Sequence, residues 1–233
     1  MNHIITMIKK QLKDTLKNKA VLIQFVMFPF MGVFMTNAVK IDGMPPNFFT
    51  NLFASMYVGM APLVAMSAII SEEKEKNTLR VLRMAGVTPW EYLAGIGCYV
   101  FTFCMAGAAV FCLLLEEGTP LSGRLLFFAA MAVGTVVSLT VGAAIGVGCP
   151  NQMSATSVTV PVMMVFSFLP MLSTFNETVA KAAKYLYSEQ LRIVVNAAGE
   201  GRMEYGNPLA VVMNLLAAGG LFWVLYRKRG LEL

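Results

Sequence analysis

Charged residues are scarce in this 233-residue chain, of which only 13% is Asp, Glu, Lys or Arg while 57% is hydrophobic. An ordinary soluble domain carries about 25% charged residues. The few charges also lie in short clusters, so the stretches between them are long and apolar. The composition therefore excludes a soluble globular protein and predicts an all-α integral membrane protein.

The long apolar stretches contain no Asp, Glu, His, Lys or Arg. Ion-coupled carriers usually keep such a residue at membrane depth, and intramembrane hydrolases need a base beside their nucleophile. The chain also has no G-x-x-x-x-G-K-[ST] loop with which to hold the phosphates of ATP. If the protein transports a substrate, its energy is therefore expected to come from another polypeptide.

Cysteine and histidine are too few and too scattered to indicate a metal or disulfide centre. His3 is the single histidine, and Cys98, Cys104, Cys112 and Cys149 lie in or beside apolar stretches without paired spacing. We interpret these cysteines as small apolar residues and expect no metal site and no catalytic residue.

Six apolar stretches approach the roughly 20 residues that a helix needs to cross a bilayer. The fifth is the weakest, because hydroxyl side chains and two prolines, Pro161 and Pro170, interrupt it. We still expect six spans, since five would place the two basic ends of the chain on opposite sides. The predicted transmembrane helices cover residues 20–39, 52–70, 92–115, 125–148, 154–172 and 208–226.

Lysine and arginine concentrate in three segments that six spans place on one side. These are the leader, the loop after the second span and the C-terminal tail. The positive-inside rule assigns this side to the cytoplasm, which predicts a multi-pass protein of the plasma membrane with both termini cytoplasmic. The neutral loop 173–207 then lies outside.

The leader, residues 1–19, has an apolar and a basic side at helical spacing. Ile5, Ile8 and Leu12 lie on one side, and Lys9 and Lys13 on the other. This pattern predicts an amphipathic helix in the inner interface of the membrane, with a plain topogenic charge cluster as the alternative. A cleaved signal is disfavoured, because the apolar run that follows is longer than the roughly 7 to 15 residues of a signal.

A charged segment, residues 71–83, follows the second predicted span. Ser71 can cap a helix at its start, acidic residues suit the first turn, and Glu72 and Lys76 have the spacing of a favourable ion pair. Such a helix could dock a soluble partner, although the pattern alone favours a solvated charge run.

Two of the predicted spans carry small or polar side chains at helical spacing. In the fourth, Gly134, Ser138, Gly142 and Gly146 repeat every four residues, which favours close helix packing. In the fifth, hydroxyl groups could line a transport path, or could only bind backbone carbonyls freed by Pro161. The possible path residues are Ser154, Thr156, Ser157 and Thr159.

The run Glu-Lys-Glu-Lys-Asn-Thr-Leu at residues 73–79, followed by Thr-Pro-Trp-Glu at 88–91 and by Gly95, is similar to the signature of ABC-2 type permeases. In that family the run reads approximately E-[KR]-E-[KR]-G-T-L. Asn77 replaces the usual Gly, a mild change because Asn tolerates left-handed backbone. Six spans with both termini inside also resemble the family over the whole chain.

The resemblance implies an ABC-2 type (type V exporter-like) permease fold and a permease subunit of an ABC exporter in a prokaryotic cytoplasmic membrane. The ATP-hydrolysing enzyme, with its ATP and Mg²⁺, would be a separate chain, and this chain would hold no cofactor. The implied partners are two copies of a cytosolic ABC ATPase, a second permease copy as homodimer or heterodimer, and membrane lipid, with no nucleic acid. The alternative is a non-transport membrane scaffold or accessory subunit that docks a soluble partner through its charged loop.

The resemblance also implies roles for two segments. Residues 71–83 would be a coupling helix that sits in a cleft of the ATPase and transmits its movement to the spans. Residues 173–207 would form extracellular re-entrant or interfacial helices, with a solvated outer loop as the alternative. The residues expected at the ATPase contact are Glu73, Glu75, Lys76, Thr78, Leu79, Arg80 and Leu82.

Overall fold

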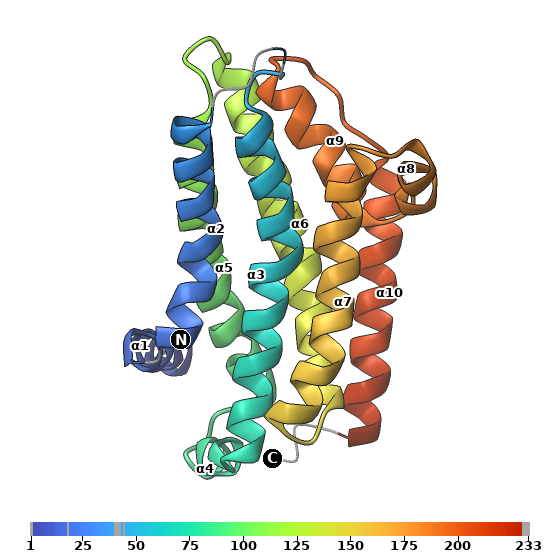
Figure 1. The fold of residues 1–233 in the computed structure, drawn as a ribbon. Helices are drawn as coiled ribbons and strands as arrows, with labels where there is room; N and C mark the ends of the chain where they lie inside the picture. The colour runs from blue at the N-terminus through green and yellow to red at the C-terminus, as the bar shows by residue number, and fades with distance from the viewer. Residues whose placement is uncertain (1, 18, 40–42, 44, 230–233) are drawn as a thin grey trace.

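The computed structural model describes residues 2–17, 19–39, 43 and 45–229. In this part of the chain it contains ten helices and no strand. The long helices run side by side between two ends of a bundle, while α1 lies across one end (Figure 1). The helices are α1 (Asn2–Lys17), α2 (Lys19–Ala38), α3 (Phe48–Glu75), α4 (Thr78–Met84), α5 (Pro89–Leu114), α6 (Leu121–Gly148), α7 (Gln152–Ser173), α8 (Glu177–Ala183), α9 (Tyr187–Gly199) and α10 (Pro208–Arg229).

Five of the described helices are long and apolar enough to cross a bilayer, namely α3, α5, α6, α7 and α10. The first predicted span forms α2, but its described apolar stretch, Leu22–Ala38, is shorter than those five. Helix α2 packs along α3 and α5. A multi-pass membrane protein is thus confirmed, while a sixth crossing by α2 stays a prediction.

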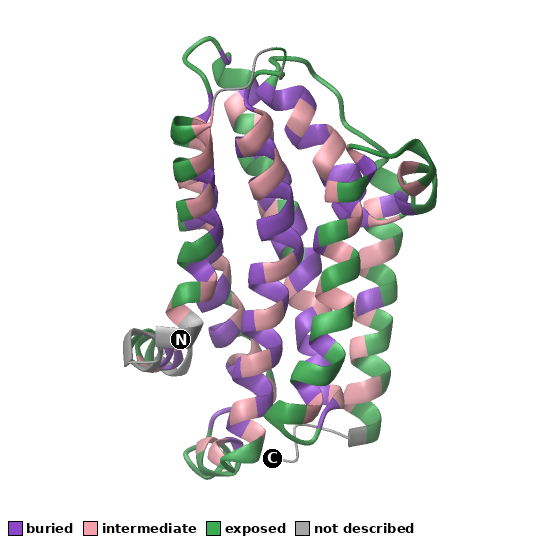
Figure 2. Ribbon diagram, in the orientation of Figure 1, coloured by how far each residue is buried: buried purple, intermediate pink, exposed green. Residues whose placement is uncertain are grey.

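Helix α3 is the centre of the bundle. It packs against α2, α5, α6, α7 and α9, and Figure 2 shows buried residues along most of its length. Its charged end was predicted to begin a new helix at Ser71, and this prediction is wrong. Because nothing interrupts the backbone there, α3 continues to Glu75, and the Ser71 hydroxyl donates to the Ser67 and Ala68 carbonyls inside the helix.

The predicted face of small residues on α6 is confirmed as a packing surface. A Cβ atom on Gly142 would lie 2.4 Å from the Leu63 carbonyl oxygen of α3, so only glycine permits this approach. The Ser138 hydroxyl on the same face donates to the Val58 carbonyl oxygen, 2.6 Å away. This close contact fixes α6 against the central helix.

Helix α1 covers the predicted amphipathic leader and packs against α5. Met7 and Gln11 form its buried side, whereas Ile5 and Leu12 are exposed. Ile8 packs against the hydrophobic core of the bundle, whereas Ile5 and Leu12 face away from it. Their contact with the membrane interface stays a prediction.

Candidate functional site

The charged segment after α3 forms a projecting turn and helix at one end of the bundle (Figure 1). Helix α3 ends at Glu75, and Asn77 adopts a left-handed conformation with φ of 56° before α4 begins. After α4, Gly86 has φ of 83°, and a capping box between Thr88 and Glu91 starts α5. The predicted single coupling helix over residues 71–83 is therefore wrong, because the left-handed turn divides it into the end of α3 and a separate α4.

Glu73 joins the end of α3 to α1. Its carboxylate accepts a hydrogen bond of 2.7 Å from the Gln11 amide and forms an ion pair with Lys10. The Glu73 side chain is 9% exposed, compared with 32% for Lys10. A buried carboxylate of this kind must keep its partners, since breaking a buried pair costs about 3–5 kcal/mol. One oxygen of this carboxylate, Oε1, thus binds the chain's own leader, and the predicted contact of Glu73 with an ATPase stays a prediction.

The next two charged residues bind two other helices. The Lys74 ammonium donates to the Val147 and Cys149 carbonyl oxygens, both 2.8 Å away, where α6 ends. The Glu75 carboxylate accepts from the Gln152 backbone N–H at 2.9 Å, where α7 begins. These charges suit the negative end of one helix dipole and the positive end of another. Together with Glu73, this turn of α3 links α1, α6 and α7, and we call residues 73–75 the junction.

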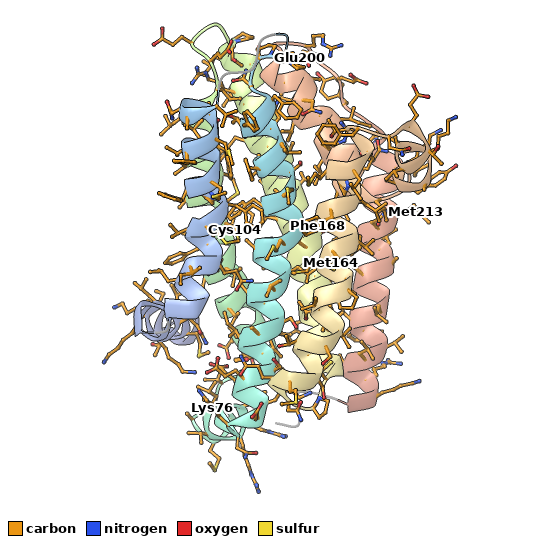
Figure 3. The ribbon with its side chains drawn as sticks, viewed as in Figure 1. Lys76, Cys104, Met164, Phe168, Glu200 and Met213 are labelled. Atoms are coloured by element: carbon orange, nitrogen blue, oxygen red, sulfur yellow. The ribbon has the colours of Figure 1, made fainter. Side chains whose placement is uncertain are left out.

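The predicted ion pair between Glu72 and Lys76 is confirmed. It lies on the outer side of the same turn, with the Lys76 side chain 65% exposed. Figure 3 shows Lys76 at this end of the bundle. An exposed pair of this type contributes under about 1 kcal/mol, because water screens both charges.

Helix α4 turns a mixed basic and apolar surface outward. Val81 and Met84 are 58% and 76% exposed, and Arg80 and Arg83 are also exposed. We call these four residues and Lys76 the tip surface. A large exposed methionine beside basic residues is typical of a protein contact site, because methionine adapts its shape to a partner.

The predicted apolar anchors of α4 face the other way. Leu79 is buried in the hydrophobic core, and Leu82 packs against that core. Thr78 is half-buried. Leu79 and Leu82 therefore attach α4 to the bundle, and the exposed apolar residues of this helix are Val81 and Met84.

The four possible path residues of α7 do not share one surface. Thr159 is buried, and its hydroxyl lies 2.8 Å from that of Ser67 on α3. Thr156 and Ser157 are exposed, but their hydroxyls donate to the Gln152 and Met153 carbonyl oxygens of their own helix. Neither acceptor is the Ser157 carbonyl that Pro161 frees, so that interpretation is wrong for these two hydroxyls, while the transport path stays a prediction. Ser154 is half-buried beside the start of α7.

The segment 173–207 forms α8 and α9 at the opposite end of the bundle, where Figure 3 shows Glu200. Helix α9 packs against α6 and α3, and most of its residues are buried. The hydroxyls of Tyr187, at its start, and Ser138 of α6 are 2.7 Å apart. Ser188, the next residue of α9, is buried as well. This depth indicates an inserted helix and not a solvated loop.

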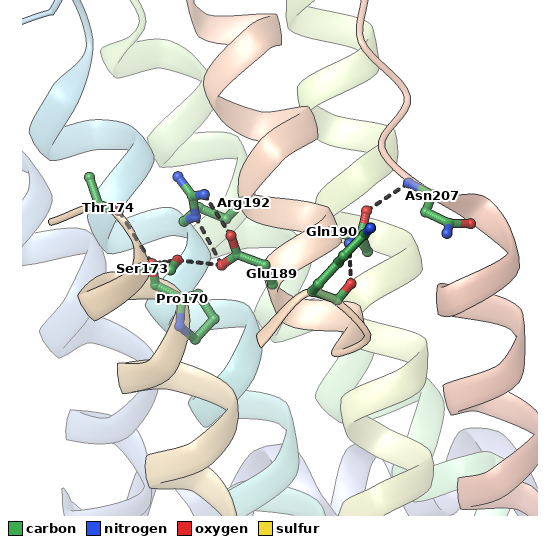
Figure 4. A network of polar contacts seen from close by, with 8 residues as sticks. Pro170, Ser173, Thr174, Glu189, Gln190, Arg192 and Asn207 are labelled. Atoms are coloured by element: carbon green, nitrogen blue, oxygen red, sulfur yellow. Dashed lines mark hydrogen bonds and ion pairs between the residues drawn. The ribbon is translucent and has the colours of Figure 1, made fainter. Parts of the chain in front are cut away.

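A buried carboxylate of α9 binds the end of α7 through a hydrogen bond and forms an ion pair within its own helix (Figure 4). The Glu189 carboxylate accepts from the Arg192 guanidinium at 2.6 and 3.0 Å and from the Ser173 hydroxyl at 2.5 Å. Glu189 and Gln190 are both buried, and sequence reasoning missed them. Only the i,i+3 spacing of Glu189 and Arg192 could have suggested this pair.

The architecture defines a multi-pass helical membrane protein with a charged projection at one end. A family model described as "ABC-2 family transporter protein" matches residues 2–225. The chain belongs to the ABC-2 family of transporter proteins. It is thus a permease of the ABC transporter class, whose membrane components associate with an ABC ATPase. Comparison with curated proteins finds no match.

Proposed function

We propose that this chain is the permease subunit of an ATP-driven exporter and that the tip surface docks on the ATPase. The observation that carries the proposal is the combination of an exposed tip with the junction, which binds three other helices, directly behind it. A partner that moves α4 also moves the end of α3, since only the turn at Lys76 and Asn77 separates them.

The junction supports mechanical coupling, because it passes a displacement of α3 to three other helices. Glu73 holds α1, Lys74 holds the end of α6, and Glu75 holds the start of α7. Charge-assisted hydrogen bonds resist separation more than neutral ones do. Movement of the tip would therefore reach α7 and α6 as well as the central helix.

The arrangement of the basic clusters supports a cytoplasmic location for this end. Helix α1, α4 and the end of α10 all lie at the same end of the bundle (Figure 1), and Arg227 and Lys228 are exposed there. If α2 is a sixth span, six crossings place these clusters on one side, as the positive-inside rule requires. Helices α8 and α9 then close the extracellular end.

Two ATPase copies and a second permease copy complete the proposed exporter. Helix α7 supports this assembly, because Met164, Phe168 and Leu172 are exposed along it. A second copy packed there would enclose a path between the two chains. The cargo would leave the cell through that path.

The test shortens two side chains of the tip surface without changing the membrane topology. Arg80→Ala combined with Met84→Ala should greatly reduce recovery of the ATPase with the permease, since a desolvated charged contact is worth about 2–5 kcal/mol, or about 30-fold or more in affinity. Lys9→Ala combined with Lys13→Ala is the matched control, because both lysines are exposed on α1 at the same end. Normal ATPase recovery by the tip variant would refute the docking site.

A second measurement separates export from the scaffold alternative. A cysteine introduced at Phe168 should change its labelling rate when ATP and vanadate are added to the assembled complex, because coupling moves α7. A scaffold would recover the ATPase but show no such change. This readout does not require knowledge of the cargo.

A further inference from the structure

We propose that a membrane phospholipid binds with one acyl chain in a groove between α7 and α10 and with its phosphate at Lys228. The groove has a volume of about 540 Å³, within the roughly 300–1,000 Å³ of ordinary ligand pockets. Helix α6 forms its floor through Val141 and Ile145. Helices α7 and α10 form its walls and hardly contact each other, so the groove opens to the side.

The lining excludes a polar occupant. It carries no charged side chain, and its aliphatic residues include Val158, Val165, Ala217 and Leu221. The two polar groups at its upper end already have partners, because the Tyr187 hydroxyl binds Ser138 and the Asn214 amide donates to two backbone carbonyls. Water gains too few hydrogen bonds in such a place, since a buried water needs about two to four. A hydrocarbon chain is the occupant that satisfies this surface.

The position of the groove can be compared with the depth of one leaflet of a bilayer. With a rise of 1.5 Å per residue, Val158 and Val165 lie about 9 and 20 Å along α7 from its start at Gln152. One leaflet contributes about half of the roughly 30 Å of hydrocarbon. The groove therefore begins in the leaflet nearest the tip surface and ends just beyond the middle of the bilayer.

A phosphate-binding group lies directly below the groove. Lys228 follows Leu221 by seven residues, which places it on the same face of α10 and about 10 Å closer to the end of the bundle. Lys228 is exposed. Arg227 lies on a different face, with its guanidinium 5.1 Å from the centre of the Trp223 ring. Trp223 and Arg227 form an ordinary interfacial anchor, whereas Lys228 is in line with the acyl chain.

Ser154 completes the mouth from the α7 side. It precedes Val158 by four residues, so it lies on the groove face of α7 one turn nearer the end of the bundle. A serine hydroxyl can donate to a phosphate or ester oxygen. The chemistry at the mouth is therefore polar and cationic, while the chemistry above it is purely apolar, as in a phospholipid.

The first experiment uses the full chain in liposomes that contain phosphatidylglycerol with a photoreactive diazirine in its acyl chain. After illumination, peptide mass spectrometry should find the label concentrated on the groove residues of α7 and α10. Ala217→Phe, and independently Leu221→Trp, should reduce this labelling at least fivefold by filling the groove. Ala106→Phe, at an exposed position of α5, should leave it unchanged.

The second experiment tests the headgroup contact. Lys228→Glu should lower labelling by the anionic lipid several-fold, while Arg227→Glu, one residue away on the other face, should not. Equal effects of the two changes would overturn the contact at Lys228. Labelling spread evenly over all exposed helices, or unaffected by both filling variants, would overturn the groove site.

A second copy of the chain is the competing occupant. Cysteines introduced at Val158 and Leu221 should not form disulfides between chains, and efficient cross-linking there would refute lipid binding. These measurements need no ATPase, so their failure would leave the proposed function untouched. Failure of the tip experiment would likewise leave the lipid site standing.

Discussion

Replacing Glu73 by alanine removes the carboxylate that joins α1 to the end of α3. The Gln11 amide, which is buried, loses its acceptor, and an unsatisfied buried donor costs about 1–3 kcal/mol. The Lys10 side chain is 32% exposed and regains water, so the full cost of about 3–5 kcal/mol for an unpaired buried charge does not apply. We expect Glu73→Ala to destabilise the protein by about 1–3 kcal/mol, chiefly by releasing α1.

The assay follows unfolding of the purified protein in detergent with a thiol-reactive dye. Cys104 and Cys149 are buried, so their thiols react with the dye only when the bundle opens. Glu72→Ala is the matched control, because its pair with Lys76 is exposed and should cost under about 1 kcal/mol. A double-mutant cycle of Lys10→Met with Glu73→Gln then isolates the pair. Equal destabilisation by the two alanine variants, or a coupling energy near zero, would refute the role of the buried Glu73 carboxylate in holding α1.

Two further predictions concern the helix contacts. Gly142→Ala should destabilise the bundle by about 1–3 kcal/mol, because its Cβ would lie 2.4 Å from the Leu63 carbonyl oxygen. Gly97 has open space around it, so Gly97→Ala should have little effect in the same dye assay. Thr159→Val should lower the free energy of unfolding by about 1 kcal/mol, because the hydrogen bond to Ser67 is lost. Ser157→Ala removes a hydroxyl that binds only its own helix, so it should change neither stability nor ATP-driven labelling at position 168. A transport defect confined to Ser157→Ala would instead show that this hydroxyl lines the transport path.

The long helices could be predicted because uninterrupted apolar runs determine them. Helices α5 and α6 lie within a few residues of their predicted bounds, and the four-residue repeat on α6 indicated its packing face. The division at Asn77 was not predicted as a break. Asparagine is compatible with both helix and left-handed turn, so the choice depends on the packing of Leu79 into the core.

The sequence located the candidate site but could not predict which of its residues are buried and which are exposed. Glu73 and Arg80 are both charged residues of one run, yet Glu73 is buried and Arg80 is exposed. The difference arises from Gln11, which lies 62 residues earlier and cannot be associated with Glu73 by local pattern. Glu189 was missed for the same reason, since its partner Ser173 belongs to another helix.

The junction also restricts how α3 can move. Successive helical residues point about 100° apart, so residues 73–75 reach around most of the helix circumference to three different neighbours. Rotation of α3 about its own axis would break all three contacts at once. Tilting or sliding of α3 would keep them if α1 and the adjoining ends of α6 and α7 moved with it as one rigid unit. A one-residue insertion between Ile70 and Glu73 would impose that rotation permanently. An insertion or deletion in this turn should therefore be more damaging than the substitution of any one of its side chains. Length changes here should also be far less tolerated than in the exposed segment 201–206.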